Sequence, residues 1–351
     1  MSFPASPLRR LLLAALATAA LSPALSATAA EPVRIRFTLD WRFEGPAAPA
    51  LLAKAKNHFA AEGLDVEIDA GSGSAAAVTR VATGAYDMGF ADFNALIEQE
   101  AKTPGTGIKA VYMVYNTTPA AIFLDKKAGV STPAGLAGKT LAAPVFDGGR
   151  KSWPIFARAN GLAVDAVKWQ TVEPAIRETL LARGSVDGIT GFYFTSVLNL
   201  EARGMKPDQF TVLRYADHGV ELYGNAIIAS PKMLKEQPDA VKGFLRAFNK
   251  ALKETLANPD AAVAHVKDRD ALVNVELESR RLKLALENVH PTAETKKLGL
   301  GAVDGERLAR SITQVVEAFE LGKQPEAKAL FSADFLPPLA ERMVRPAGDA
   351  R

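Results

Sequence analysis

TLDWRFEGP, residues 38–46, is the stretch that decides the fold. It follows VRIRF at residues 33–37, whose alternation of apolar and charged side chains predicts a β-strand. The Ala-rich segment 47–60 comes next and predicts a helix. Open α/β sheets bind ligands beyond the carboxyl ends of their strands. Polar and aromatic residues at such a turn therefore predict one wall of a binding site.

The same strand-to-helix alternation continues outward from this stretch. Apolar strands are expected at residues 66–68, 87–91 and 108–115, each with a helical pattern after it. A second series of strands and helices runs from 121 to 223, and after one more strand at 225–229 the chain is nearly all helical. Strands that alternate with helices are typical of a mostly parallel sheet. The sequence therefore predicts an α/β fold.

Two changes in this pattern predict the domain boundaries. We expect a discontinuous lobe 1 from residues 30–120 plus 224–340, a lobe 2 from 121–223, and a tail at 341–351. The chain then crosses between the lobes twice, near residues 119–121 and 222–224. Two crossings form a hinge, and a hinge between lobes predicts a cleft that closes.

The first 29 residues predict a cleaved secretory signal. Arg9 and Arg10 precede an apolar run at residues 11–21, and small residues follow at 27–29. The run is too short for a membrane span. The chain has no cysteine, which excludes disulfides, Cys-type zinc sites and lipid attachment at a cleavage-site cysteine. We therefore expect a periplasmic protein without a lipid anchor.

Candidate ligand-binding residues follow the predicted strands in both lobes. Carboxylates, amides and hydroxyls suit polar recognition, an arginine suits a carboxylate or sulfonate, and aromatic rings suit a ring-bearing ligand. The candidates are Asp40, Trp41, Phe43, Glu44, Ser72, Ser74, Asp92, Asn94, Asn116, Thr117, Phe146, Asp147, Arg150, Trp153, Phe192, Tyr193 and Tyr223.

Each candidate also has a purely structural alternative. Asp40 and Asp92 suit helix caps, and Trp41 and Trp153 suit a hydrophobic core. The loop that carries Arg150 suits a solvated surface. The sequence leaves these alternatives open.

The residue patterns do not indicate catalysis, metal binding or nucleic-acid binding. The four histidines are His58, His218, His265 and His290, and none lies in a metal-binding spacing or beside a nucleophile motif. The net charge is only +3, without a basic cluster of the kind that nucleic-acid binding requires. We expect no enzyme activity, no cofactor and no nucleic-acid partner.

A family resemblance arises from several motifs in order: LDW at 39–41, GSGS at 71–74, GAYDMG at 84–89 and LLARGSVDG at 180–188. The chain resembles the periplasmic substrate-binding proteins of ABC importers. Within them it is similar to the NMT1/THI5-like group, which includes nitrate, sulfonate and thiamine-pyrimidine binders. The resemblance implies a two-lobed type II periplasmic-binding fold. It also implies ABC permease and ATPase subunits as partners of a monomer.

The chain departs from the group at residues 42–48, RFEGPAA. Pyrimidine-binding members usually have Asn and His there, and the pyrimidine-synthesising enzymes of the group use His and a Cys-rich motif. The absence of both argues against that enzyme. We expect a ring-bearing solute, pyrimidine-like or an aromatic acid, held in the cleft. Alkyl sulfonates such as taurine, or nitrate, are the alternative ligands, and a sensory binding module is an alternative role.

Overall fold

The computed structural model describes Met1, residues 31–289 and residues 292–344. The expected signal, His290 and the last residues of the expected tail lie outside the described residues. Within the described part, no helix is long and apolar enough to cross a membrane. The fold continues past the boundary expected at residue 340, because Arg342 is buried and donates to the carbonyls of Leu298 and Leu300, each at 2.8 Å.

The first sheet contains five strands in the order β2-β1-β3-β10-β4. Their bounds are β1 Val33–Thr38, β2 Leu64–Asp69, β3 Met88–Asp92, β4 Lys109–Met113 and β10 Asn225–Ala229. β1 is parallel to β2 and β3, whereas β10 lies antiparallel between β3 and β4. β10 is therefore the single reversed strand.

The second sheet repeats this plan in the order β7-β6-β8-β5-β9. Its strands are β5 Ala120–Asp125, β6 Thr140–Ala143, β7 Lys168–Thr171, β8 Gly188–Phe192 and β9 Phe210–Arg214. β6 is parallel to β7 and β8, and β5 is antiparallel to β8 and β9. In each sheet the reversed strand is the one that follows a crossing. Both sheets are therefore mixed, with the other strands parallel.

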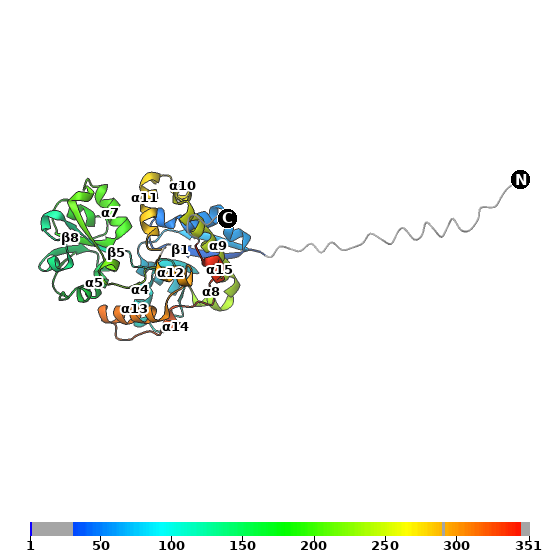
Figure 1. The fold of residues 1–351 in the computed structure, drawn as a ribbon. Helices are drawn as coiled ribbons and strands as arrows, with labels where there is room; N and C mark the ends of the chain where they lie inside the picture. The colour runs from blue at the N-terminus through cyan, green and yellow to red at the C-terminus, as the bar shows by residue number, and fades with distance from the viewer. Residues whose placement is uncertain (2–30, 290–291, 345–351) are drawn as a thin grey trace. The chain divides into compact units, whose positions relative to one another are not determined.

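Helices cover both sheets, and Figure 1 shows α5 and α7 grouped with β5 and β8, and α9 to α11 grouped with β1. The helices of the second sheet are α5 Gly148–Ala159, α6 Arg177–Ala182 and α7 Tyr193–Glu201. Those before β5 are α1 Ala48–Ala55, α2 His58–Ala61, α3 Ser74–Ala82 and α4 Phe93–Lys102. Those after β10 are α8 Pro231–Glu236, α9 Pro238–Ala257, α10 Pro259–Arg269, α11 Val275–Leu286, α12 Ala293–Leu298, α13 Gly305–Ala318, α14 Ala327–Leu330 and α15 Leu339–Arg342.

The expected helix at residues 47–60 is broken into α1 and α2. Asn57 lies between them with a φ of 57°, in the left-handed region, and this ends the first helix. Asn tolerates that conformation better than most residues. The break turns α2 so that Phe59 stacks on Phe244 of α9 with ring centroids 4.8 Å apart.

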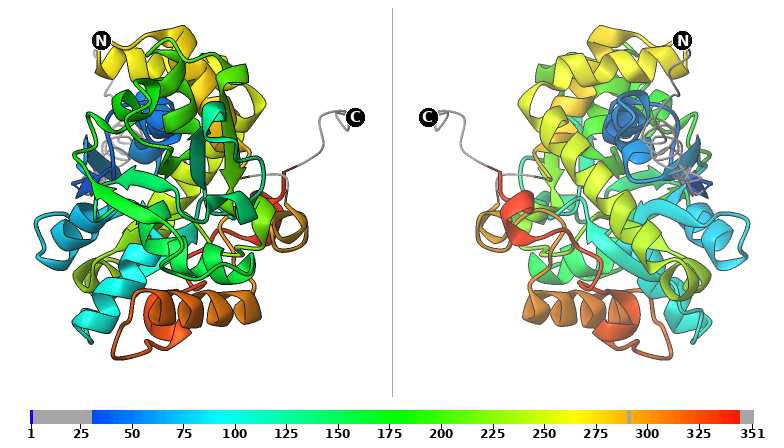
Figure 2. Two further views of the ribbon diagram at one scale, coloured as in Figure 1. Left: turned by 90° about the vertical axis from the view of Figure 1, so that its left-hand side faces the viewer. Right: turned by 90° about the vertical axis from the view of Figure 1, so that its right-hand side faces the viewer.

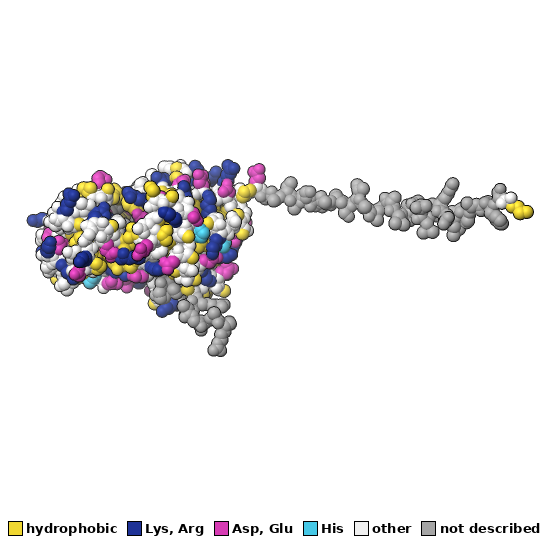
Figure 3. Space-filling view, turned by 90° about the horizontal axis from the view of Figure 1, so that it is seen from above, with side chains coloured by type: hydrophobic (Ala, Val, Ile, Leu, Met, Phe, Trp, Pro, Cys, Tyr) yellow, Lys and Arg dark blue, Asp and Glu magenta, His cyan; other side chains and the backbone are white. Residues whose placement is uncertain are grey.

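One hydrophobic core crosses the boundary between the sheets. It contains Leu96 of α4, Phe156 of α5, and Leu308, Ile312 and Val315 of α13. α13 therefore packs against a helix of each lobe, and both views in Figure 2 show it as the orange helix along one edge of the fold. On the face seen in Figure 3, Lys and Arg side chains are mixed with Asp and Glu side chains.

Candidate functional site

A cavity of about 410 Å³ lies between the two lobes. This volume is within the range usual for small-molecule sites. Its walls are mostly the turns at which strands lead into helices, as the sequence predicted for residues 38–46. The sequence-predicted residues that line it are Asp40, Trp41, Glu44, Ser74, Asp92, Asn94, Phe146, Asp147 and Phe192.

Asp40 lies at the floor of the cavity on the lobe 1 side. Its Oδ2 accepts hydrogen bonds from Asn225 Nδ2 at 2.7 Å and from Ser74 Oγ at 3.3 Å. Burial raises the pKa of this carboxyl to about 6, and the two hydrogen bonds only partly oppose the shift. Asn225 starts β10, so residues far apart in the sequence build this floor together.

Asp92 lies beside Asp40 and caps α4. Its Oδ1 accepts from the backbone N–H of Asn94 at 2.8 Å, while its own N–H donates to Ser74 Oγ at 3.0 Å. Burial, and the nearby charges of Asp40 and Asp147, raise the pKa of Asp92 to about 7. Among the described residues, no salt bridge joins a cation to Asp40 or Asp92.

Two buried amide oxygens at this floor have no hydrogen-bond partner in the described structure. They are Oδ1 of Asn94 and Oδ1 of Asn225. Both side chains are buried and both residues line the cavity. A buried polar atom without a partner costs free energy, so a ligand that satisfies it is stabilised.

The pKa shifts predict that the ligand-free protein loses stability as the pH rises. The folded pKa of Asp92 is about 7 against 3.8 in the unfolded chain, so between these values only the folded state holds the proton. Asp40 acts in the same direction up to about pH 6. We expect the melting temperature to fall from about pH 5.5 to about pH 7.5.

Asp92→Asn tests this expectation, because Asn caps helices as well as Asp does. The variant should gain about 1–2 kcal/mol at about pH 7.5 and have a flatter dependence of melting temperature on pH. Asp208→Asn, at an exposed aspartate of lobe 2, is the control and should leave the slope unchanged. A destabilised Asp92→Asn protein with the parent's slope would show that Asp92 is ionised in the folded state.

The lobe 2 wall contains a buried ionic cluster. Asp147 caps α5: its Oδ1 accepts from the N–H of Arg150 at 2.9 Å and from Thr190 Oγ1 at 2.6 Å. Arg177 donates to Asp147 Oδ2 at 3.1 Å and to Glu178 Oε1 at 2.7 Å. Burial alone would raise the pKa of Glu178, but Arg177 more than offsets this and the pKa is lowered. Unlike Asp40 and Asp92, these acids are paired.

Aromatic rings form the sides of the cavity. Trp41 is half-buried on the lobe 1 side, while Phe146 on the lobe 2 side is 47% exposed. Phe192 and Phe194 contact edge to face with centroids 5.8 Å apart. Phe90, Tyr115 and Phe194 also line the cavity, although the sequence did not single them out. Rings on opposite walls suit a flat ligand.

Arg150 and Trp153 do not line the cavity, because both lie in α5, which begins at Gly148 where the sequence predicted a loop around Arg150. Only the start of this helix reaches the cleft. Trp153 is 1% exposed and donates from Nε1 to the carbonyl of Val164 at 2.7 Å. The guanidinium of Arg150 lies 5.0 Å from the ring of Trp169 and donates to the carbonyl of Ala143. We therefore remove both from the candidate ligand contacts.

Three other candidates belong to the hinge. The side chain of Asn116 donates to Glu294 Oε1 at 3.1 Å and accepts from Thr292 Oγ1 at 2.6 Å. Thr117 Oγ1 donates to Asn288 Oδ1, and Tyr223 Oη donates to Glu294. Their polar groups are used within the protein, so we remove Asn116, Thr117 and Tyr223 as well.

Phe43, Ser72 and Tyr193 also lie away from the cavity lining. The rings of Phe43 and Tyr193 pack under the guanidinium groups of Arg269 and Arg214, at 4.5 and 4.6 Å. Ser72 is exposed, and Ser74, two residues on, makes the contact with Asp40. Of these two serines, Ser74 is therefore the one that contacts the floor of the cavity.

Contacts between the lobes border the cavity on two sides. Lys151 of α5 pairs with Glu98 of α4. On the other side Arg281 of α11, which also pairs with Glu44 at 3.4 Å, donates to the carbonyl of Phe194 in α7 at 3.2 Å. These pairs link residues far apart in the chain, and no sequence motif indicated them. Among the described residues, no group of three or more acidic or histidine side chains could hold a metal ion.

Comparisons with known proteins show the family and the fold of this chain. The family described as NMT1/THI5 like matches residues 46–262. The riboflavin-binding protein RibY of Chloroflexus aurantiacus is 25% identical over 298 residues, which cover 83% of this chain and 82% of RibY.

Two solved structures show the same fold. One is the periplasmic aliphatic sulphonate binding protein SsuA from Escherichia coli, with a TM-score of 0.67, 16% identity, and coverage of 85% of this chain and 91% of that one. The other is the periplasmic nitrate-binding protein NrtA from Synechocystis PCC 6803, with a TM-score of 0.61, 16% identity and 87% coverage of both chains. The predicted two-lobed α/β fold is confirmed. The family match spans more than half of the sequence, and the chain therefore belongs to the NMT1/THI5-like family, on the fold of the periplasmic binding proteins.

Proposed function

We propose that this protein is the periplasmic solute-binding component of an ABC importer and that it carries a small, ring-bearing, pyrimidine-like solute. The ring lies between the aromatic side chains of the two lobes, and its N–H or O–H groups donate to the lobe 1 floor. Closure about the two crossings retains the solute until permease and ATPase subunits receive it. A ligand that binds the closed form better than the open form drives this closure.

The observation that carries the proposal is the unpaired acidic floor. In the part of the chain that the structure describes, no cation pairs with the half-buried Asp40 or the buried Asp92, and the free oxygens of Asn94 and Asn225 lie beside them. Such a floor attracts hydrogen-bond donors and repels anions. A neutral or cationic ring with donor groups satisfies it.

The same geometry disfavours nitrate and sulfonates. Helix N-termini bind anions through their free N–H groups. At the starts of α4 and α5, the carboxylates of Asp92 and Asp147 each already accept one of those N–H groups. α3 also starts at the cavity and has no side-chain cap, but the carboxylate of Asp40 lies there and accepts from Ser74 Oγ. The likeness to SsuA and NrtA supports the fold alone, since identity is 16% in both cases. The likeness to RibY favours a heteroaromatic ligand, since riboflavin contains a pyrimidine ring fused to two others.

A thermal-shift panel tests the proposal. Cytosine, an aminopyrimidine, riboflavin, benzoate, taurine and nitrate are each added to the exported form of the protein. A ligand present at about 100 times its Kd stabilises the folded state by about 2.7 kcal/mol, which is a clear shift in melting temperature.

We expect shifts with one or more of the donor-bearing heteroaromatic compounds and none with taurine or nitrate. Asp40→Asn is the matched variant, because it keeps the shape of the floor and removes its charge; it should reduce the shift. A shift with taurine or nitrate, and with no ring compound, would contradict the proposed ligand class while leaving the importer role intact.

A further inference from the structure

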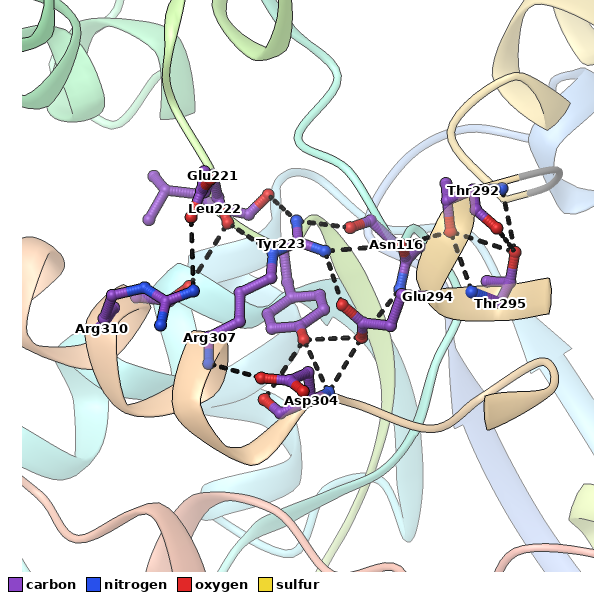
Figure 4. A network of polar contacts seen from close by, with 11 residues as sticks. Asn116, Glu221, Leu222, Tyr223, Thr292, Glu294, Thr295, Asp304, Arg307 and Arg310 are labelled. Atoms are coloured by element: carbon purple, nitrogen blue, oxygen red, sulfur yellow. Dashed lines mark hydrogen bonds and ion pairs between the residues drawn. The ribbon is translucent and has the colours of Figure 1, made fainter. Parts of the chain in front are cut away.

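The two crossing segments are tied together by residues from the last quarter of the chain. α12 and α13 come after both crossings in the sequence, yet their first turns lie against both segments (Figure 4). Glu294 is in the first turn of α12 and Arg307 is in the first turn of α13. We call this pair the hinge clasp.

One carboxylate oxygen of the hinge clasp gathers three donors. Glu294 Oε1 accepts from Asn116 Nδ2 at 3.1 Å, from Tyr223 Oη at 2.7 Å and from the N–H of Asp304 at 2.9 Å. Asn116 belongs to the first crossing and Tyr223 to the second, while Asp304 caps α13. A single side chain therefore joins both crossings to the start of a helix.

Arg307 holds the backbone of the same two segments. Its Nη2 donates to the carbonyl of Asn116 at 2.7 Å, and its Nε donates to the carbonyl of Glu221 at 2.9 Å. Its Nη1 pairs with Glu294 Oε2 at 3.0 Å, and the guanidinium lies 4.1 Å from the ring centroid of Tyr223. A planar guanidinium can make these contacts together, which an ammonium cannot.

The far end of α13 reaches the cleft. The helix has 14 residues, so it is about 21 Å long. Phe319, directly after it, lines the cavity, and its ring lies 5.3 Å from Nζ of Lys151, which pairs with Glu98 across the lobes. α13 thus connects the hinge clasp to the cavity wall and packs on α4 of lobe 1 and α5 of lobe 2 along the way.

We infer that Glu294 and Arg307 are positioning residues that set the angle between the lobes, and thereby the ligand affinity, without touching the ligand. Lobe opening requires the backbone of both crossings to rotate. Hydrogen bonds to the carbonyls of Asn116 and Glu221 resist that rotation. Because apparent affinity scales with the population of the binding-competent form, a loosened clasp weakens binding of any ligand. The inference does not depend on which solute is carried.

The absence of cysteine allows a direct test without ligand. Cysteines are introduced at Ala55 of α1 and Ala202 at the end of α7, which are exposed positions in lobe 1 and lobe 2. Spin labels on these two cysteines report the distance between the lobes as a distribution. The parent double-cysteine protein is compared with Arg307→Ala and Arg307→Lys.

Arg310→Ala is the matched control, one turn further along α13. Arg310 is exposed, and its polar contacts with the described residues are ion pairs at 3.5 and 3.9 Å, with Glu221 and Glu306. We expect a broader distribution shifted to longer distances for Arg307→Ala, an intermediate one for Arg307→Lys, and the parent distribution for Arg310→Ala. Affinity for any compound active in the thermal-shift panel should fall several-fold in the same order.

A folded Arg307→Ala protein with the parent's distance distribution would overturn the inference. Cooperative unfolding, followed by circular dichroism, establishes that the variant is folded. If Arg307→Ala does not fold, Glu294→Gln provides the test of the hinge clasp instead, since glutamine keeps an acceptor oxygen but loses the charge that faces Arg307. An unchanged distribution in Glu294→Gln and Arg307→Lys would then refute the clasp. Neither result bears on the ligand class.

Discussion

Arg177→Ala should lower the free energy of unfolding by about 3–5 kcal/mol, because it leaves buried carboxylates without a cation. Arg177 is 9% exposed and Glu178 is 1% exposed. The guanidinium bonds Asp147, Glu178 and Ser196, the last at 3.0 Å. Denaturant unfolding followed by circular dichroism measures the loss.

Arg183→Ala is the matched control for this prediction. Arg183 ends the same helix, α6, at an exposed position, and its replacement should change the free energy of unfolding by less than about 0.5 kcal/mol. The double variant Arg177→Met with Glu178→Gln should recover part of the loss, since it removes a buried charge from each side. Equal losses in the single and double variants would assign the effect to packing and not to charge.

Trp41→Ala should weaken ligand binding by about thirtyfold, which corresponds to ~2 kcal/mol, while the protein remains folded. Trp41 lines the cavity and is half-buried, so its removal takes away a stacking surface but little core. Isothermal titration with the most active compound of the panel measures the change.

Tryptophan fluorescence gives an independent reading of the same contact. The chain has 3 tryptophans, and only Trp41 lines the cavity, since Trp153 is in the core of lobe 2 and Trp169 packs under Arg150. Ligand should quench the parent and the control Trp169→Ala, but not Trp41→Ala. Parent-like affinity and quenching in Trp41→Ala would place the ring stack elsewhere in the cleft.

The sequence predicted those parts of the site that short-range patterns control. Asp40 and Trp41 follow an alternating strand, and Asp92 follows a short apolar one, so their place at the carboxyl ends of strands could be foreseen. The strands themselves were predictable because apolar periodicity reflects burial directly. The local sequence pattern does not, however, determine the direction in which each side chain points.

The α5 region shows why Arg150 and Trp153 were misplaced. The segment that contains Gly148, Gly149 and Arg150 was expected to be a loop. Capping by Asp147 nevertheless starts the helix at Gly148, which turns Trp153 into the core. Arg281, Arg177 and Asn225 were missed for a different reason. Each acts on a residue at least 30 positions away, as in the 185-residue separation between Asn225 and Asp40.

The position of β10 has a consequence for the order in which the two sheets form. β3 and β4 both pair with β10 and do not pair with each other in the sheet order, so the first sheet keeps a gap until residues 225–229 have emerged. The second sheet uses only residues 120–214 and can be completed earlier. Segments that emerge first generally fold first, and long-range strand pairing is slow. Lobe 1, whose first strands emerge before those of lobe 2, is therefore completed last. Asn225 is the first residue of β10, so the pairing of this strand also brings the Asn225 amide to Asp40.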